Sequence, residues 1–408
     1  MRPLPDAQRS VLAAIPTLPA TRVPVWRASG LVLAEDVVAS QNVPPFANSA
    51  MDGFAVRHAD IGFTPVTLRV SEDVAAGHVA AGSVAPGTAI RIMTGAPIPD
   101  GADTVVRVED TESAGDSVRI RVAPPAGASV RVAGGDVTAG TTVFPAGTRL
   151  TPAHLGVLAA IGAATPVVHR RPRVAILSTG DEVQPPETVT LQPGWIRDAN
   201  RPLLTGLLSE LGVDVHDYGI IPDDAARLRA TLQRAAEECD VVMTSGGVSM
   251  GDYDLVKAVL TELGGVELWK VAMQPAKPFA FGAIGSTPLF GLPGNPVSVM
   301  VAFEQFARPA LLKMMGSHFL FRPRLPGSMT HRVQTDPEKT VFLRVMVELP
   351  GFAATSAGEQ SSNVLSAAAN ADAFAVVPTG VGAVEEGGAV SLEMFGWPES
   401  RTIDEVLG

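Results

Sequence analysis

The sequence predicts an α/β multidomain protein with a central doubly wound, mostly parallel sheet, an inserted β-rich domain and a second β-rich domain at the C-terminal end. Three observations predict this fold class. Strand-like and helix-like segments alternate between residues 171 and 318, which is typical of a parallel sheet covered on both faces. Short β-like runs alternate with Gly and Pro turns in residues 60–140, and again after residue 321. The chain of 408 residues is also too long for one hydrophobic core.

Two short helices frame the first β-rich part. Residues 8–20 are predicted to form a helix, because Val11, Leu12 and Ile15 fall on one of its faces. A second helix is predicted over residues 152–161, with Thr151 as its N-cap. If the segments before and after the β-rich part pack together, that part is an insertion.

Four helices are predicted in the central part of the chain. The first starts at Asn200, carries leucines at helical spacing and ends at Gly212, a residue suited to a helix C-terminus. The second starts with Asp223 and Asp224, whose charge suits a helix N-terminus, and runs to residue 238. The others cover residues 254–263 and an apolar stretch from Asn295 to about residue 315.

Three short apolar runs in this central part each break into a loop of Gly, Ser or Thr, and acid or amide residues. The runs begin at Val174, Val241 and Pro288, and their loops cover residues 178–182, 244–254 and 291–298. Because the carboxyl ends of parallel strands meet at one edge, these loops are expected to converge on one ligand crevice. The glycines allow backbone N–H groups to approach an anion, and the carboxylates and hydroxyls can hold a hydrated metal ion.

The composition favours a folded soluble protein and excludes some functions. The chain is 46% hydrophobic and 18% charged, with a net charge of −11 and no long Lys/Arg run, so non-specific nucleic-acid binding is not expected. Cys239 is the only cysteine, which excludes an intramolecular disulfide and favours a packed thiol. The seven histidines show no paired metal spacing. The N-terminus has no apolar signal core, so a cytoplasmic location is expected.

Seven motifs together carry a resemblance to a known family. In chain order they are PPFANSAMDGFAV at 44–56, MTGAPIPDGADTVV at 93–106, STGDEV at 178–183, RDANRPLL at 197–204, SGGVSMGDYD at 245–254, KPFAF at 277–281 and GLPGNPVS at 291–298. The chain resembles the molybdenum cofactor insertion family, molybdopterin molybdenumtransferase (MoeA), which is shared with the C-terminal domain of gephyrin. One such motif is a weak signal, whereas seven in the family's order are specific.

The resemblance implies a domain organisation and a reaction. Residues 1–40 and 141–170 would form an elongated dimerisation segment, 41–140 an inserted β-rich domain, 171–318 an α/β molybdopterin-binding domain, and 319–408 a C-terminal β-barrel-like domain. It implies a homodimer with its site in a cleft between the α/β domain of one subunit and the β-domain of the other. The implied reaction inserts molybdate into adenylylated molybdopterin, releases AMP and needs a divalent cation, Mg²⁺.

The same resemblance implies which residues act. The catalytic candidates are Asp52, Thr94, Glu182, Asp254 and Lys277. The candidates for binding molybdopterin or molybdate are the loop residues Thr179, Gly180, Asp181, Ser245, Gly246, Gly247, Pro293, Gly294, Asn295, Pro296 and Ser298. The candidate Mg²⁺ contacts are Glu182, Asp252 and Asp254, because acids beside an anion repel it unless a cation lies between them. Lys277 would neutralise the pyrophosphate or molybdate.

Several of these residues also have an ordinary structural interpretation. Asp52 suits a turn that it caps itself, Glu182 suits a helix N-terminus, and a lone Lys277 suits solvent. Arg344 and Ser362 match weaker family positions, and surface polar residues are the alternative.

The sequence also departs from the family pattern at three places. Ala276 replaces a Gly, Gly135 replaces a Glu, and Ser361 replaces a Gly of a Gly-Ser pair. An alanine in a phosphate loop blocks close backbone approach if its position needs a positive φ.

The sequence is therefore compatible with two functions from different classes. The first is the enzyme, favoured by the acids and hydroxyls at Asp52, Thr94, Glu182 and Asp254. The second is a gephyrin-like dimeric scaffold that binds a short linear peptide of a membrane receptor, or of a cytoskeletal or cell-division partner. The altered loops favour the scaffold.

Overall fold

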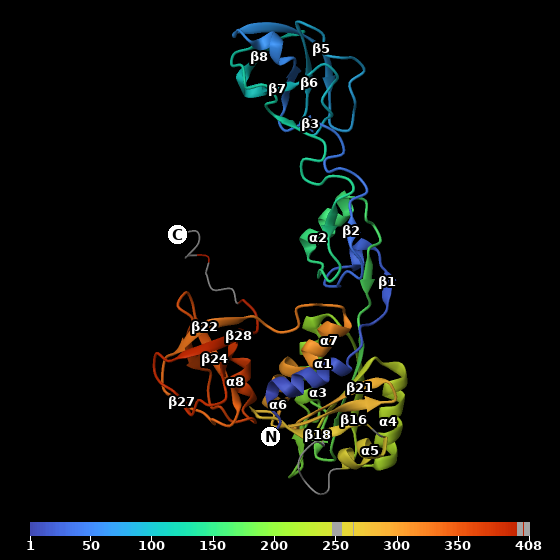
Figure 1. The fold of residues 1–408 in the computed structure, drawn as a ribbon, viewed down its shortest axis with the longest axis vertical. Helices are drawn as coiled ribbons and strands as arrows, with labels where there is room; N and C mark the ends of the chain where they lie inside the picture. Colours follow the sequence, from blue (N-terminus) through green and yellow to red (C-terminus); the bar gives the residue numbers. More distant parts are fainter. Residues whose placement is uncertain (247–254, 264, 398–402, 404–408) are drawn as a thin grey trace. The chain divides into compact units, whose positions relative to one another are not determined.

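The computed structural model describes residues 1–246, 255–263, 265–397 and 403. The chain forms two compact units, one of residues 22–168 and one of residues 1–21 together with residues 169–408 (Figure 1). The catalytic candidates Asp52 and Thr94 belong to the first unit. The three Gly-rich loops belong to the second.

The first unit contains a curled six-stranded sheet in the order β7-β4-β6-β5-β9-β8. Its strands are β4 (Gly53–Val56), β5 (Val66–Val74), β6 (Thr88–Ile92), β7 (Thr104–Arg107), β8 (Thr111–Ala114) and β9 (Ser117–Ile120). Alternate residues of a strand point to opposite faces, so Phe54 and Val56 pack in one hydrophobic cluster and Ala55 in another. The sheet therefore has core on both faces.

The rest of this unit is built from chain segments that precede and follow the sheet strands in the sequence. Strand β2 (Val37–Val38) pairs with β11 (Thr142–Phe144), and helix α2 covers Pro152–Ala160. Leu31 and Leu33 share one core with Leu158, so the chain returns to the same core after the β-rich part. The sheet is an insertion, and the predicted N-cap, Thr151, starts α2.

The second unit is organised by a six-stranded sheet in the order β16-β13-β17-β21-β20-β18. The strands are β13 (Arg173–Thr179), β16 (Asp214–Ile221), β17 (Val241–Ser245), β18 (Glu267–Lys270), β20 (Pro278–Ile284) and β21 (Thr287–Leu292). The first four in this order pair in parallel, and β20 and β18 pair antiparallel. The sheet is mostly parallel, as the strand–helix alternation predicts.

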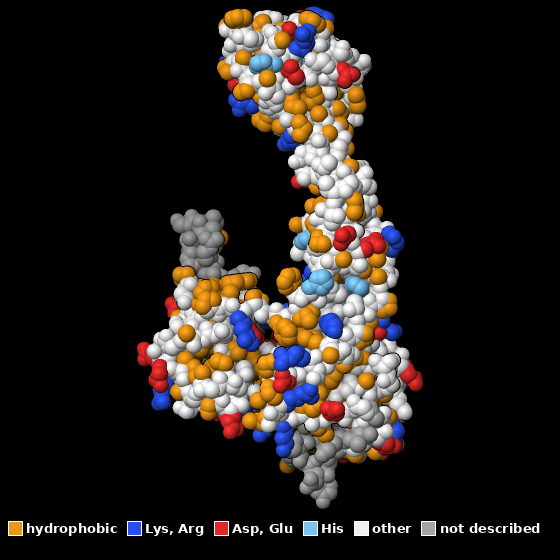
Figure 2. Space-filling view, viewed as in Figure 1, with side chains coloured by type: hydrophobic (Ala, Val, Ile, Leu, Met, Phe, Trp, Pro, Cys, Tyr) orange, Lys and Arg blue, Asp and Glu red, His pale blue; other side chains and the backbone are white. Residues whose placement is uncertain are grey.

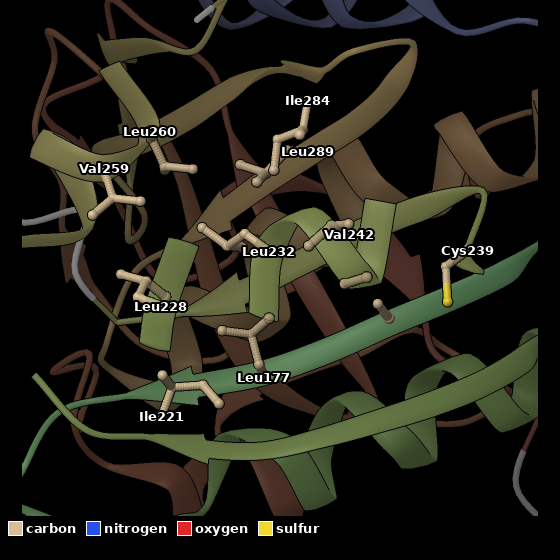
Figure 3. Close-up of a cluster of buried hydrophobic side chains, with 12 residues drawn as sticks. Leu177, Ile221, Leu228, Leu232, Cys239, Val242, Val259, Leu260, Ile284 and Leu289 are labelled. Carbon is tan, nitrogen blue, oxygen red and sulfur yellow. The ribbon is translucent and has the colours of Figure 1, made fainter. Parts of the chain in front are cut away.

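Helices cover this sheet on both faces. On one face, α4 (Ala225–Glu238) and α5 (Leu255–Leu263) bury Leu228, Leu232 and Leu260 against the strands (Figure 3). Cys239 is 4% exposed in this cluster, which confirms the packed thiol. The elements of the other side are α1 (Leu4–Ala14), α3 (Asn200–Leu211), α6 (Pro296–Ala302) and α7 (Arg308–Met314). Gly212 ends α3 with a φ of +76°, as predicted.

Two helices differ from the sequence prediction. Helix α1 covers Leu4–Ala14, so it starts and ends earlier than the predicted helix of residues 8–20, and it belongs to the unit that contains residues 169–408. The predicted helix of residues 295–315 is interrupted between α6 and α7 by a π-helical turn at Phe303–Ala307. Pro309 accounts for the interruption, because it has no N–H and its ring excludes the carbonyl of residue 305 in a regular α-helix.

The C-terminal region is a closed five-stranded barrel. Its strands follow each other in the order β24-β25-β22-β28-β26, and β26 pairs back onto β24. They are β22 (Arg324–Met329), β24 (Thr340–Glu348), β25 (Ala353–Ser356), β26 (Ala373–Val377) and β28 (Ala389–Met394), with helix α8 at Leu365–Ala369. Outside the barrel, β19 (Met273–Gln274) adds in parallel to β24. A two-residue strand from the α/β part therefore belongs to the sheet of the C-terminal domain.

Candidate functional site

The three Gly-rich loops leave the sheet at one edge. In the parallel ladder Ser178 of β13 lies opposite Ser245 of β17, and Ser245 lies opposite Leu292 of β21. The strands therefore end at the same level, and the loops that follow start side by side. This register confirms the predicted convergence of the loops.

A cavity of about 700 Å³ lies at this edge. Eight predicted residues line it: Thr179, Glu182, Gly246, Lys277, Pro293, Gly294, Asn295 and Ser298. The C-terminal barrel domain contributes Lys339, Gln360, Ser361 and Ser362. The cavity is thus shared by the α/β domain and the barrel of the same unit.

The charged residues of the lining are few. Among the described residues, Glu182 is the acid, and Lys277 and Lys339 are the bases. Hydroxyl groups of Thr179, Ser298 and the two C-terminal serines supply neutral hydrogen-bonding groups. A lining with two lysines and one carboxylate suits an anionic ligand.

Glu182 lies directly over the glycine of the STGDEV motif. A Cβ atom added to Gly180 would lie 2.4 Å from Glu182 Oε2, and Gly180 has a φ of +127°. The backbone conformation therefore favours glycine at this position, and any side chain here would push the Glu182 carboxylate aside. The carboxylate of Glu182 can occupy its place because residue 180 has no side chain.

Two other backbone positions beside the cavity have left-handed conformations. Gly246 has a φ of +90°, and Ala276 has a φ of +68° and is 3% exposed. Ala276 is the residue that replaces a family glycine, so the loop keeps a positive φ without glycine. An L-residue in this region costs about 1–2 kcal/mol, which the surrounding structure offsets.

The loop of residues 291–298 is fixed by asparagine side chains. Asn200 Nδ2 donates to the carbonyl of Gly294 at 2.7 Å, and Asn295 Nδ2 donates to Ser362 Oγ at 2.8 Å. The second bond joins the α/β domain to the barrel. The weaker family match at Ser362 therefore lies in the cavity wall.

Arg344 is fully buried, so the alternative interpretation of Arg344 as a surface polar residue is wrong. Its Nη2 donates to the carbonyls of Glu359 at 2.8 Å and Ser361 at 3.2 Å. Burial lowers the pKa of its guanidinium. Closure of the barrel buries this side chain beneath the loop that lines the cavity, so Arg344 supports that loop from behind.

Several predicted residues do not line the cavity. Gly180 lies beneath Glu182, Ser245 is buried at the end of β17, and Pro296 is the first residue of α6. Asp181 accepts a hydrogen bond from the backbone N–H of Asp223 at 3.1 Å, on the loop after β16. Gly247, Asp252 and Asp254 lie outside the described residues.

In the other unit, Asp52 and Thr94 lie together. The backbone N–H and the hydroxyl of Thr94 donate to Asp52 Oδ1 at 2.7 Å and 2.8 Å. These two bonds hold the pKa of Asp52 below its ordinary value, so its carboxylate stays charged. Both side chains are exposed, and the structure brings these two catalytic candidates into direct contact.

The donors present fit a magnesium ion held partly by its substrate. Among the described residues, no group of three or more His, Cys, Asp or Glu side chains converges as a metal site. Glu182 offers one carboxylate to the cavity. Magnesium takes one or two carboxylates and completes its shell with water and phosphate oxygens, so a single acid is sufficient on the protein side.

Two further residues of the lining, Lys339 and Gln360, come from the C-terminal domain and were not predicted from the sequence. Lys339 and Gln360 lie far along the chain from the Gly-rich loops and belong to none of the seven motifs. No helix in the described part of the chain combines the length and apolar character that crossing a membrane requires.

Comparisons with protein families cover nearly the whole chain. Residues 2–162 match the MoeA N-terminal region (domain I and II), and residues 175–313 match a probable molybdopterin binding domain. Residues 326–395 match the MoeA C-terminal region (domain IV). The three matches follow one another in the order of that family.

Individual relatives agree with these matches. The chain is 41% identical over 405 residues to molybdopterin molybdenumtransferase 2 of Mycobacterium tuberculosis, covering 97% of this chain and 99% of the relative. It is 32% identical to gephyrin of Dictyostelium discoideum, covering 92% of this chain and 59% of gephyrin. Its structure is similar to that of the molybdopterin biosynthesis MoeA protein of Pyrococcus horikoshii, with a TM-score of 0.83, 29% identity and coverage of 97% and 100%.

Proposed function

Because this chain belongs to the MoeA family, and relatives at up to 41% identity are molybdopterin molybdenumtransferases, we propose that it inserts molybdate into adenylylated molybdopterin and releases AMP. The reaction is a step of molybdenum cofactor biosynthesis. The observation that carries the proposal is the cavity in which Glu182, Lys277 and Gly246 meet the loop of residues 293–298.

The size and charge of the cavity support this substrate. Its volume of about 700 Å³ lies in the range of small-molecule sites, about 300–1,000 Å³. Adenylylated molybdopterin carries a pyrophosphate, and molybdate is a divalent oxyanion. Lys277 and Lys339 provide the positive groups that such anions need, and the turn at Gly246 after β17 allows close backbone approach.

The proposed roles follow from the positions of the side chains. When water attacks the molybdopterin phosphorus and forms a new P–O bond, the bridging P–O bond breaks and the bridging oxygen leaves with AMP. Negative charge develops on that oxygen, and the ammonium of Lys277 stabilises it. Glu182 would hold Mg²⁺, with Asp252 and Asp254 as further predicted ligands. When bound, the ion neutralises phosphate oxygens. The stiff loop around Asn295 orients the substrate.

Asp52 and Thr94 are proposed to act in the same reaction. Thr94 keeps the Asp52 carboxylate charged and fixes its direction through two hydrogen bonds to one oxygen. A fixed, exposed carboxylate suits the orientation of a hydrated cation or of an oxyanion substrate. In keeping with the family resemblance, we propose that the active form is a homodimer.

Two alanine variants test the proposal. Glu182→Ala and Asp52→Ala are each expected to reduce conversion of adenylylated molybdopterin and molybdate to active cofactor by about 10²-fold, as for loss of a preorganised electrostatic contact. Glu187→Ala is the matched control, because Glu187 is exposed in the loop that follows β14 (Val183–Gln184) and does not line the cavity. Thermal unfolding of all three variants should stay close to that of the unmodified protein.

The assay is reconstitution of a molybdoenzyme, and an active family member run in parallel shows that the substrates are competent. If the unmodified chain shows no turnover while the active family member does, the proposed enzymatic function is refuted. The gephyrin-like scaffold would then be tested with peptide partners.

A further inference from the structure

Lys339 reaches the cavity from the C-terminal domain, at the point where β19 joins the barrel. It directly precedes β24, whose first residue, Thr340, lies opposite Met273 of β19. The backbone N–H of Thr340 donates to the carbonyl of Ala272 at 3.0 Å. Lys277 follows β19 in the chain and lines the same cavity. The strand pair therefore fixes the main chain beside both lysines.

A tight turn holds Lys339 in place. The backbone N–H of Lys339 donates to the carbonyl of Asp336 at 3.1 Å, and the N–H of Glu338 donates to Asp336 Oδ1 at 3.0 Å. Lys339 Nζ lies 2.5 Å from Asp336 Oδ2, and the lysine side chain is 19% exposed. A side chain that is ordered and mostly shielded before any ligand arrives loses less conformational entropy on binding.

The charges around this turn form one electrostatic group. The bond from Lys339 and the N–H of Glu338 lower the pKa of Asp336, and Lys277 adds a smaller effect in the same direction. The Asp336 carboxylate therefore interacts electrostatically with both Lys339 and Lys277. An ammonium has three donors, so Lys339 can keep its bond to Asp336 and donate to a second oxygen in the cavity.

We propose that Lys339 is a second anion-binding residue of the cavity, which binds a tetrahedral oxyanion together with Lys277 and is held in position by Asp336. The proposal rests on the proposed function, because that function supplies two such oxyanions, the phosphate of the nucleotide and molybdate. Lys277 and Lys339 are the cations in the described part of the lining, so loss of either one removes about half of its positive charge. On the face in Figure 2, Lys and Arg side chains also gather near the junction of the α/β domain and the barrel.

Calorimetric titration of the full chain with AMP, with molybdate and with inorganic phosphate tests the proposal. The test variants are Lys339→Gln and Lys339→Arg, and the matched control is Lys270→Gln. Lys270 is exposed on β18 and does not line the cavity. The control variant therefore removes one positive charge from the α/β domain outside the cavity.

Lys339→Gln is expected to weaken binding at least tenfold for the oxyanion that Lys339 contacts, whereas Lys270→Gln changes it less than twofold. Lys339→Arg should recover part of the affinity, because the positive charge remains. A loss with AMP and phosphate identifies the nucleotide phosphate as the contact, and a loss with molybdate alone identifies the metal oxyanion. Lys339→Gln should also make binding less sensitive to salt.

Equal binding by Lys339→Gln and Lys270→Gln to all three probes would overturn the proposal. Thermal unfolding identifies a variant that fails to fold. If Lys339→Gln fails to fold, the titrations of Lys339→Arg and Asp336→Asn test the proposal in its place. Asp336→Asn keeps Lys339 but removes its anchor, and a weaker loss of affinity is expected. Turnover is not needed for these titrations, so failure of the proposed function and failure of this inference are distinguishable.

Discussion

Substitution of Gly180 by alanine is the sharpest single test of how the site is built. The new Cβ would lie 2.4 Å from Glu182 Oε2 and 2.8 Å from its Cδ, whereas ordinary contacts start at 3.4 Å. The Glu182 carboxylate must therefore move by about 1 Å. For a group with the role proposed for Glu182, a displacement of that size is expected to cost on the order of 10²-fold in rate.

The same substitution also has a defined cost in stability. Gly180 has a φ of +127°, which side-chain-bearing residues adopt only with strain of about 1–3 kcal/mol. For an α/β domain of this size, each kcal/mol shifts Tm by about 2–4 °C. The expected outcome is thus a folded protein with a Tm lowered by about 2–12 °C and very low activity.

Gly285→Ala is the matched control. Gly285 lies in the turn between β20 and β21 with a φ of +60°, and a Cβ there would meet no atom within 4 Å. Its cost is about 1–2 kcal/mol with full activity, because nothing in the cavity moves. Cofactor formation and thermal unfolding are measured on both variants. If Gly180→Ala keeps a third or more of the activity while its Tm falls as expected, the placement of Glu182 over Gly180 is not what catalysis requires.

Three further outcomes are expected. Burial acts to raise the pKa of Asp240, but bonds from Arg170 and the N–H of Arg173 outweigh it and lower that pKa. The charged carboxylate therefore stabilises the fold at pH values above about 3.9, the pKa of an aspartate in the unfolded chain, and this stabilisation is lost as the pH falls through the lowered pKa of the folded state. The variant Asp240→Asn should have a lower Tm than the unmodified protein at pH 7, and this difference in Tm should become smaller below about pH 4. Titration with Mg²⁺ should release little heat without nucleotide, and a tight nucleotide-independent site would contradict the assignment of the acids. Light scattering at low micromolar concentration should give a dimer, and a mass of 42.3 kDa would refute it.

The central sheet could be predicted from the sequence because its signals are local. The runs that start at Val174, Val241 and Pro288 are apolar over their whole length and are followed by Gly-rich loops, and parallel order then places those loops at one edge. The positive φ that the sequence raised as a question for Ala276 is present at +68°. Short-range patterns were sufficient for this half of the site.

The other half depends on pairing between distant parts of the chain. Lys339 enters the cavity because β24 pairs with β19, which lies more than sixty residues earlier. Arg344 sits in the middle of a strand-like run, and its burial follows only from closure of the barrel. Neither event leaves a periodic pattern near the residue concerned, so the sequence alone gave no reason to expect them.

The pairing of β19 with β24 limits how this protein can be divided into modules. A fragment that ends at residue 318 would keep every strand of the α/β sheet, yet Met273 and Gln274 would lose the partner that holds them. The segment leading to Lys277 would then have an unpaired edge in place of a neighbouring strand. Attachment of the barrel therefore does more than add a domain, because the barrel supplies the strand that pairs with Met273 and Gln274 of the α/β part. The two parts are therefore expected to be inherited, exchanged and engineered as a single unit.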